Sequence, residues 1–236
     1  MFKRPHHQRI GHVLAALNRD VLAQHHCWFG GGTCIALRYG EYRESVDIDF
    51  LISDAAGYRE IRQMLTGAQG LAPIVRAGAV SLQLARDVRA DQYGIRTQVL
   101  MDGHAIKFEI VREARIELQT PTKPDQICGV STLTVLDLAT SKLLANADRQ
   151  ADDGVFSRDL IDLAMMNLTV VQLRAAVDKA SQAYGQSISR DLSKAIDRAE
   201  QRGGWLDRCI QAMAIETPKA VLWQKIRNLR RVLPAA

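Results

Sequence analysis

The sequence has few cysteines, few aromatic residues and no long apolar run. None of its hydrophobic stretches reaches the length of a membrane helix, and the basic start MFKRPHHQR is not followed by the apolar segment of a secretory signal. Its cysteines, Cys27, Cys34, Cys128 and Cys209, are scattered and match neither a zinc-binding spacing nor a disulfide framework. These absences favour a cytoplasmic protein with reduced thiols.

Acidic residues are in the minority. The 31 Lys and Arg residues outnumber the 26 Asp and Glu, which gives a net charge of +5 and a pI near 9.2. This balance permits a polyanionic partner such as nucleic acid, although the basic residues are spread out and match no RNA-binding motif. The length of 236 residues and the 47% hydrophobic content suit one large or two small globular domains.

Two pairs of adjacent histidines, His6-His7 and His25-His26, raise the question of a zinc site. Adjacent side chains on a helix or strand point in different directions, and no cysteine or carboxylate lies at ligand spacing from either pair. We therefore expect no zinc site here.

The most informative stretch is WFGGGTCIALRYGEYRESVDIDF, residues 28–50. Its consecutive glycines allow backbone N–H groups to approach a ligand closely. The apolar run Cys34–Leu37 predicts a short helix whose first N–H groups and dipole suit an anion such as phosphate.

The same stretch ends in an alternating pattern. Val46, Ile48 and Phe50 are expected to point into a core, which leaves Asp47 and Asp49 together on the solvated face of a strand. Two neighbouring carboxylates suit a hard divalent cation, and Mg²⁺ carrying substrate phosphates fits best. A lone D-x-D or a lone glycine triplet is common, but the two in this order indicate metal-assisted phosphoryl or nucleotidyl transfer.

Further elements follow from periodicity and turn signals. We expect amphipathic helices over residues 8–24 and 54–65, the second capped by Asp54, and β-strands over residues 73–76, 80–85, 95–101 and 104–111. Asp102-Gly103 predicts a hairpin between the last two strands.

The strand after that hairpin supplies a third acidic candidate. Ile106, Phe108 and Ile110 share one face, so Lys107 and Glu109 share the other. If this strand pairs beside the aspartate strand, Glu109 joins Asp47 and Asp49 in a metal site. The alternative is a solvated glutamate beside Lys107.

Two prolines in the polar run 120–125 indicate a linker, after which the pattern is helical. The predicted helices span residues 131–146, 155–167, 170–184, 189–202, 204–214 and 217–232. The expected fold is α+β: a catalytic domain with a mixed sheet flanked by helices over residues 1–122, then a helical bundle over residues 123–236 that completes an active-site cleft.

The helical half holds a second group of charges. Lys142 and Arg149 lie about two turns apart on one helix face, and Asp159 and Asp162 lie three apart on the next helix. They could meet across the helix pair. Considered alone, the pattern favours an interhelical salt-bridge cluster.

Gly31-Gly32-Thr33 followed by Asp47-Ile48-Asp49 resembles the signature of the DNA polymerase β-like nucleotidyltransferases. With the later pattern Lys142…Arg158-Asp159-x-x-Asp162, the chain from Gly31 to Leu163 resembles more narrowly the AbiEii-type nucleotidyltransferase toxins of type IV toxin–antitoxin systems.

This resemblance implies an Mg²⁺-dependent transfer of a nucleotide from an NTP to an acceptor hydroxyl. It places the metal on Asp47, Asp49 and Glu109, and makes Lys142 and Asp159 catalytic. It assigns nucleotide binding to Gly31, Gly32, Thr33, Arg43, Lys142, Arg158 and Asp162. Where the family pattern has Asp as the third acid, this chain has Glu109.

The implied acceptor is RNA, plausibly the 3′ end of tRNA, with growth arrest as the result and a cognate antitoxin encoded nearby that forms no stable complex. Two alternatives remain open. The acceptor is a small molecule or a protein side chain, or the chain is a non-catalytic nucleotide-binding module. Arg38, Arg43 and Lys107 around the site suit an anionic acceptor better than a cationic drug.

Overall fold

A computed structural model describes residues 2–233, so residue 1 and residues 234–236 at the ends of the predicted domains lie outside the described part. The chain forms two compact units. The sheet unit consists of Met1–Glu41 and Ser45–Thr134, and the helical unit consists of Tyr42–Glu44 and Val135–Ala236. The chain thus passes into the helical unit for a short segment before it completes the sheet.

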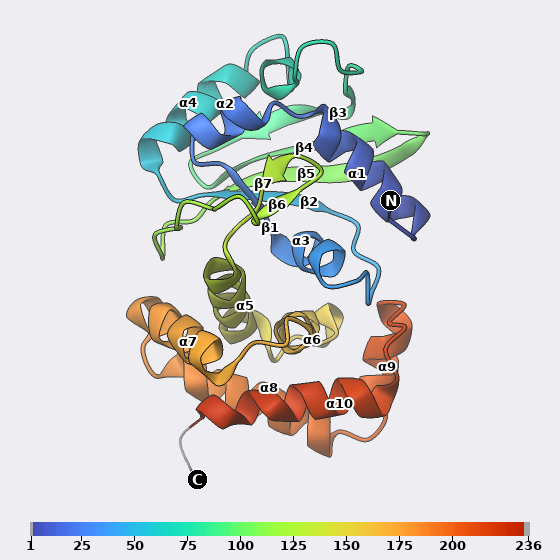
Figure 1. Ribbon diagram of the computed structural model, residues 1–236, viewed down its shortest axis with the longest axis vertical. Coiled ribbons are helices and arrows are strands. Elements are labelled where there is room, and N and C mark those ends of the chain that lie inside the picture. The colour runs from blue at the N-terminus through green and yellow to red at the C-terminus, as the bar shows by residue number, and fades with distance from the viewer. Residues whose placement is uncertain (1, 234–236) are drawn as a thin grey trace. The chain divides into compact units, whose positions relative to one another are not determined.

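The sheet unit is built on a mixed sheet of five strands in the order β1-β2-β5-β4-β3 (Figure 1). The strands are β1 (Trp28–Gly30), β2 (Ile48–Ile52), β3 (Gln83–Ala90), β4 (Gly94–Met101) and β5 (His104–Arg112). β2 and β5 run parallel, whereas the other neighbouring pairs are antiparallel. The predicted α+β class with a mixed sheet is therefore confirmed.

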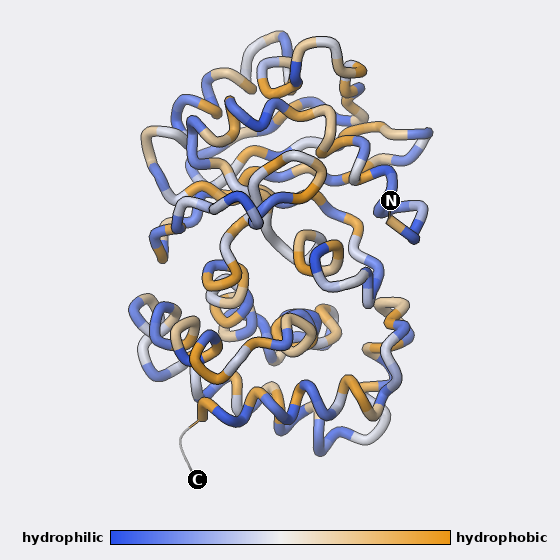
Figure 2. The backbone as a smooth tube through the Cα atoms, viewed as in Figure 1, coloured by the Kyte–Doolittle hydropathy of each residue, from blue (hydrophilic) through white to orange (hydrophobic). Residues whose placement is uncertain are grey.

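Alternation along the strands gives the sheet one apolar and one polar face. Ile48, Phe50, Phe108 and Ile110 are fully buried, and hydrophobic residues recur along the strands in Figure 2. Helices α1 (Pro5–Ala16), α2 (Arg19–Gln24), α3 (Gly31–Arg38) and α4 (Ala55–Leu65) belong to the same unit, with α2 and α4 on one side of the sheet and α3 on the other (Figure 1).

Two predictions that depend only on neighbouring residues are confirmed. Asp54 caps α4 by accepting hydrogen bonds from the N–H groups of Ala56 and Gly57. Asp102 and Gly103 both have positive φ and connect β4 to β5, which is the type I′ geometry expected of an Asp-Gly hairpin.

Other predicted elements differ. The helix expected over residues 8–24 is interrupted, because Leu17 is extended and Asn18 starts α2 as its N-cap. The predicted strand at residues 73–76 is a 3₁₀ turn over Ala72–Ile74, where Pro73 cannot donate to a strand ladder. The strand expected over residues 80–85 forms later, as β3.

The boundary between the units lies at residues 134/135, later than the polar run 120–125 suggested. After that run, β6 (Gln126–Ile127) and β7 (Val130–Ser131) form a small hairpin, and the N–H of Leu133 donates to the carbonyl of Phe29 in β1. These contacts keep the hairpin in the sheet unit.

The helical unit consists mainly of α5 (Val135–Arg149), α6 (Arg158–Met165), α7 (Val170–Tyr184), α8 (Ser187–Gln201), α9 (Trp205–Ala212) and α10 (Lys219–Asn228). The predicted helix 170–184 coincides with α7, whose Thr169 and Gln172 form a capping box. α5 starts later than expected because Val130–Ser131 are in β7, and α6 starts later because Phe156 and Ser157 are left-handed. Within residues 2–233, no helix combines the length and hydrophobicity needed to cross a membrane.

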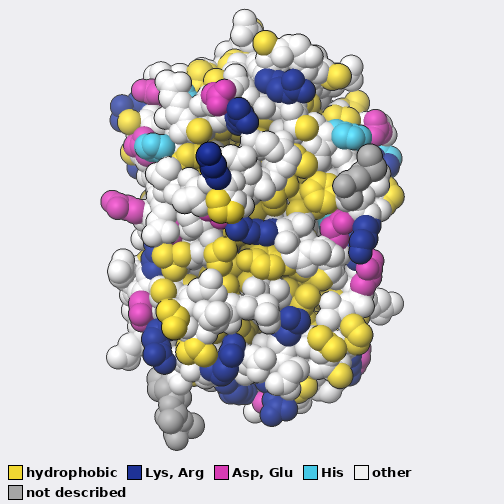
Figure 3. All heavy atoms as spheres, in the orientation of Figure 1, with side chains coloured by type: hydrophobic (Ala, Val, Ile, Leu, Met, Phe, Trp, Pro, Cys, Tyr) yellow, Lys and Arg dark blue, Asp and Glu magenta, His cyan; other side chains and the backbone are white. Residues whose placement is uncertain are grey.

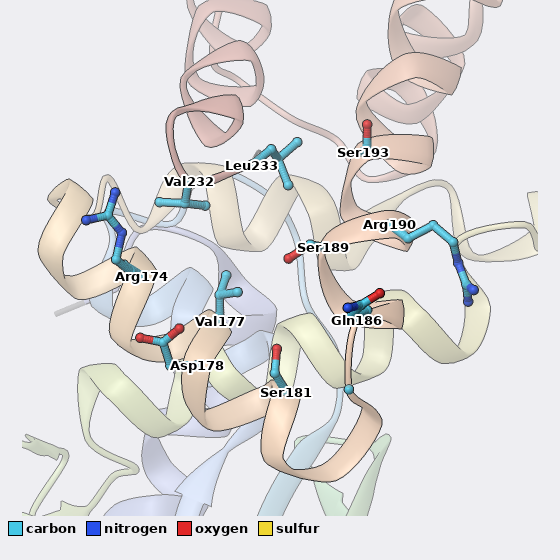
Figure 4. A pocket seen from close by; sticks show the side chains of 11 residues that line it. Arg174, Val177, Asp178, Ser181, Gln186, Ser189, Arg190, Ser193, Val232 and Leu233 are labelled. Carbon is cyan, nitrogen blue, oxygen red and sulfur yellow. The ribbon is translucent and has the colours of Figure 1, made fainter. Parts of the chain in front are cut away.

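A groove of about 860 Å³ lies in the helical unit between α7, α8 and the C-terminal 3₁₀ turn η3 (Leu229–Val232) (Figure 4). Its rim carries Arg174, Asp178 and Arg190, and Val177 and Val232 provide an apolar part. It contains none of the residues predicted for the nucleotide site.

Candidate functional site

Asp49 lies against the glycine turn. In the β1–β2 ladder Asp49 is opposite Gly30, and α3 begins at the next residue, Gly31. Gly31 has a φ of +68°, and a Cβ at that position would come within 2.3 Å of Asp49 Oδ2. A side chain on Gly30 would come within 2.7 Å of Leu51 and Leu133. The glycines therefore allow the carboxylate to approach the N-terminus of α3.

The N-terminus of α3 offers backbone N–H groups and the positive end of a helix dipole, as the sequence predicted. Gly31 and Gly32 are partly exposed, so their backbone is accessible. The side chain of Thr33 is different: it is buried, and its Oγ1 donates to Ser45 Oγ at 2.8 Å. Thr33 therefore supports the loop before Asp47.

The contact between Gly31 and Asp49 allows a direct test. We expect Gly31→Ala to lower nucleotidyl transfer at least about tenfold, because the new methyl group displaces the Asp49 carboxylate. Gly40→Ala is the matched control, since Gly40 also has positive φ but a Cβ added there would meet no atom within 4 Å. Both variants incur the same backbone strain of about 1 kcal/mol. If Gly31→Ala and Gly40→Ala were equally active, the contact between Gly31 and Asp49 would not matter for the reaction.

Asp47 precedes the strand instead of lying in it. β2 starts at Ile48, and Val46 is 49% exposed, so the expectation that Val46 points into the core is wrong. Pairing with β5 begins at Ile48 and pairing with β1 at Asp49, so the chain before Ile48 is not held in alternation. Ile48 and Phe50 are buried as predicted.

Glu109 lies beside Asp49, as predicted, because the two residues are partners in the parallel β2–β5 register. Its carboxylate is engaged by two cations: Lys107 Nζ lies 2.6 Å from Oε2, and Arg96 Nε lies 3.4 Å from Oε1. Among residues 2–233, no three His, Cys, Asp or Glu side chains are grouped as metal ligands.

Lys107 lies on the same face of β5 as Glu109, as the alternation predicted. Burial lowers its pKa, but Glu109, Asp47 and Asp49 outweigh this effect and raise the pKa above the ordinary lysine value. An ammonium group thus lies within the field of all three carboxylates.

Basic side chains continue across the polar face of the sheet. Arg96 on β4 is the partner of Glu109 on β5, and Arg89 on β3 is the partner of Arg96. Arg86 is the partner of Gln98 one step along. Arg86, Arg89 and Arg96 are exposed, so a row of guanidinium groups runs from the carboxylates towards the β3 edge.

The second predicted group is a buried cluster inside the helical unit. Lys142 on α5 lies 3.0 Å from Asp159 and 2.7 Å from Asp162, both on α6, and all three side chains are buried. Burial lowers the pKa of Lys142, but the two aspartates raise it above its usual value. The expected meeting across the helix pair is confirmed, and the contacts form an interhelical salt-bridge cluster.

Arg43 belongs to this cluster. Its Nε and Nη2 donate to Asp162 at 2.7 and 2.9 Å, and its Nη1 donates to the carbonyl of Glu44. Tyr42, which the sequence did not single out, donates its hydroxyl to Asp162 at 2.5 Å. Arg43 is 5% exposed. Its donors are used within the helical unit, so the predicted contact with a nucleotide would require Arg43 to release part of this pairing.

At the outer end of the cluster, Arg149 donates to Asp159 at 2.6 and 2.9 Å. Burial raises the pKa of Asp159, but Lys142 and Arg149 hold it well below the ordinary range. Arg158, the first residue of α6, is partly exposed, so solvent reaches this predicted nucleotide-binding cation more readily than the buried Lys142.

The family model of the nucleotidyl transferase AbiEii toxin of type IV toxin–antitoxin systems matches residues 12–227. No curated protein was found as a significant relative.

Among solved structures, the chain resembles a candidate nucleotidyltransferase from Helicobacter pylori, with a TM-score of 0.52, 14% identity and coverage of 96% of both chains. It also resembles JHP933 from Helicobacter pylori, with a TM-score of 0.53, 14% identity and coverage of 99% of this chain and 95% of the other. At such identities the likeness concerns the fold. The family match extends over both units, and the chain therefore belongs to the AbiEii nucleotidyltransferase toxin family.

Proposed function

We propose that this nucleotidyltransferase moves a nucleoside monophosphate from an NTP to an acceptor hydroxyl of RNA, the 3′ end of tRNA, and thereby arrests growth. The observation that carries the proposal is the position of Asp49. Its carboxylate contacts Gly31 at the N-terminus of α3 and has Glu109 as its strand neighbour. A phosphate on the α3 N-terminus would therefore lie next to a carboxylate suited to its counter-ion.

The donor set of the site fits Mg²⁺. Asp47 and Asp49 are partly exposed and supply carboxylate oxygens, which Mg²⁺ prefers. These two residues would hold the ion, and Glu109 would join them if Lys107 and Arg96 release it. When bound, the ion would neutralise phosphate charge and polarise the reacting phosphoryl group.

The chain's own groups have distinct tasks in this proposal. The N–H groups of Gly31 and Gly32 bind phosphate oxygens, while Lys107 and Arg96 neutralise charge at the edge of the site. The family resemblance implies that Lys142 of the helical unit, oriented by Asp159, contacts nucleotide phosphates and that Arg158 supports it. Because Lys142 is buried and held by two aspartates, this contact requires it to give up part of its ion pairing.

An RNA acceptor agrees with the row of Arg86, Arg89 and Arg96 beside the carboxylates, since a row of exposed cations suits a phosphate backbone. On the face drawn in Figure 3, the Lys and Arg side chains of the described residues are dispersed. The family implies a cognate antitoxin. We propose that it acts without a stable complex.

Incubation of the purified protein with each radiolabelled NTP, Mg²⁺ and total cellular RNA tests the proposal. We expect label in a tRNA-sized band on a denaturing gel, dependent on one or more NTPs and abolished by EDTA. Label in a small molecule or a protein would show that the acceptor is not RNA. Triphosphate binding without transfer to any acceptor would favour a non-catalytic module, and no binding at all would refute the proposal.

A further inference from the structure

The histidine pair His6-His7 has no part in the site described above, yet both rings reach the loop that leads to Asp47. His7, in the first turn of α1, is completely buried. Its Nδ1 lies 2.9 Å from Glu41 Oε1, and its Nε2 lies 3.2 Å from the backbone nitrogen of Ser45. The Nε2 of His6 lies 3.0 Å from the carbonyl oxygen of Val46.

Hydrogen-bond chemistry fixes the form of His7. The backbone N–H of Ser45 is always a donor, so Nε2 of His7 must accept. The proton of the neutral ring is then on Nδ1 and is donated to Glu41. Glu41, His7 and Ser45 thus form a relay in which every donor meets an acceptor. The other neutral tautomer would place the Nε2–H against the Ser45 N–H and leave Nδ1 and the Glu41 carboxylate as two facing acceptors.

The carboxylate of Glu41 is itself held in place by further hydrogen bonds. Its carboxylate accepts hydrogen bonds from the N–H groups of Lys3 at 2.7 Å and Arg4 at 3.1 Å, just before α1. Burial raises the pKa of Glu41, but these N–H groups and His7 outweigh it and lower the pKa. The backbone of Glu41 is left-handed, with a φ of +58°, a conformation that these contacts stabilise in a non-glycine residue.

Ser45 connects the relay to the glycine turn. Its Oγ accepts the hydrogen bond from Thr33 on α3, and it lies two residues before Asp47. The start of α1 and the start of α3 therefore hold one short loop, and that loop ends in the residue proposed to bind the metal. Asp47 itself lies outside the strand ladder, so the ladder does not fix its position.

From these contacts we propose that His7 is a positioning residue of the nucleotide site, which fixes the loop Ser45–Asp47 by accepting the Ser45 N–H. This inference rests on the proposed function. The Ser45 bond sets where the Asp47 carboxylate can lie relative to Asp49. The Glu41 bond sets the orientation and tautomer of the ring.

Two substitutions separate the two bonds. In His7→Gln the amide oxygen reaches the place of Nε2 and accepts the Ser45 N–H, whereas in His7→Asn the shorter amide reaches only the place of Nδ1 and meets Glu41. We expect His7→Asn to weaken NTP binding in the presence of Mn²⁺ about tenfold, and His7→Gln to restore most of that loss. Equilibrium dialysis with radiolabelled NTPs measures both.

His12 provides the matched control, because it lies on the same helix and is exposed. His12→Gln and His12→Asn should bind NTP as the wild type does. Melting temperature shows whether each variant folds, and hydrogen exchange at the Ser45 amide gives a reading that needs no ligand. That amide should exchange faster in His7→Asn than in His7→Gln.

An Asp49→Asn variant keeps the two proposals apart. If it loses Mn²⁺-dependent NTP binding while His7→Asn binds as the wild type does, the positioning role of His7 is refuted and the proposed function stands. If the wild type binds no NTP, or Asp49→Asn binds normally, the proposed function is refuted together with this inference.

Discussion

Replacement of Asp49 by asparagine is expected to lower nucleotidyl transfer by about a thousandfold, since losing a metal-binding charge costs several kcal/mol and each 1.4 kcal/mol is a factor of ten. Asparagine has nearly the same shape, so it still fits against Gly31, and the sheet should remain intact. The measurement is the initial rate of label transfer at saturating Mg²⁺ and NTP, with the melting temperature recorded in parallel.

Asp87→Asn is the control for that experiment. Asp87 is exposed on β3 of the same sheet, and it has no place in the proposed site. This variant should keep wild-type activity, which separates a specific effect from a general loss of negative charge. Transfer by Asp49→Asn within a few-fold of the wild-type rate would show that Asp49 does not bind the metal.

The second large effect concerns stability. Asp162 accepts hydrogen bonds from Tyr42, Arg43 and Lys142 and has no exposed surface. Asp162→Ala should destabilise the helical unit by about 3–5 kcal/mol, because it leaves two cations buried without their shared partner. The free energy of unfolding in urea measures the effect. Asp178→Ala, at an exposed position on α7, should change it by less than about 0.5 kcal/mol.

The same residue gives a pH dependence with a definite sign. Burial raises the pKa of Asp162, but Arg43 and Lys142 outweigh burial and lower the pKa below the ordinary aspartate value. A carboxyl whose pKa is lower in the folded state stabilises the fold above its unfolded pKa, and this contribution is lost as pH falls through the folded pKa. The wild type should therefore lose stability below about pH 4, and Asp162→Asn should lose less over that range. If the stability of the wild type and of Asp162→Asn fell equally as the pH was lowered, Asp162 would not be the group that causes this pH dependence.

The parts of the fold that the sequence predicted are encoded by neighbouring residues. The Asp102-Gly103 hairpin, the Asp54 cap and the alternation on β5 depend on residues a few positions apart. The placement of Glu109 beside Asp49 required the family resemblance as well, because alternation alone does not say which strands pair. The break at Asn18 escaped detection because the apolar spacing continues across it.

The remaining features depend on contacts between distant residues. Nothing near Arg43 in the sequence indicates that the segment Tyr42–Glu44 belongs to the helical unit, since its partner Asp162 is 119 positions away. The bond between His7 and Ser45 spans 38 positions. The adjacency of His6 and His7 argued against a zinc site, but it could not reveal that both rings contact one loop.

The position of Tyr42–Glu44 also has a consequence for synthesis on the ribosome. Arg43 emerges early, whereas the carboxylate that neutralises it emerges 119 residues later. Until Asp162 has been translated, the segment Tyr42–Glu44 lacks its partner in the helical unit. The chain that leads from this segment to the strand with Asp49 is therefore not yet fixed at its start. A nascent or prematurely terminated chain is therefore expected to be inactive, and activity should arise only once α6 has left the ribosome.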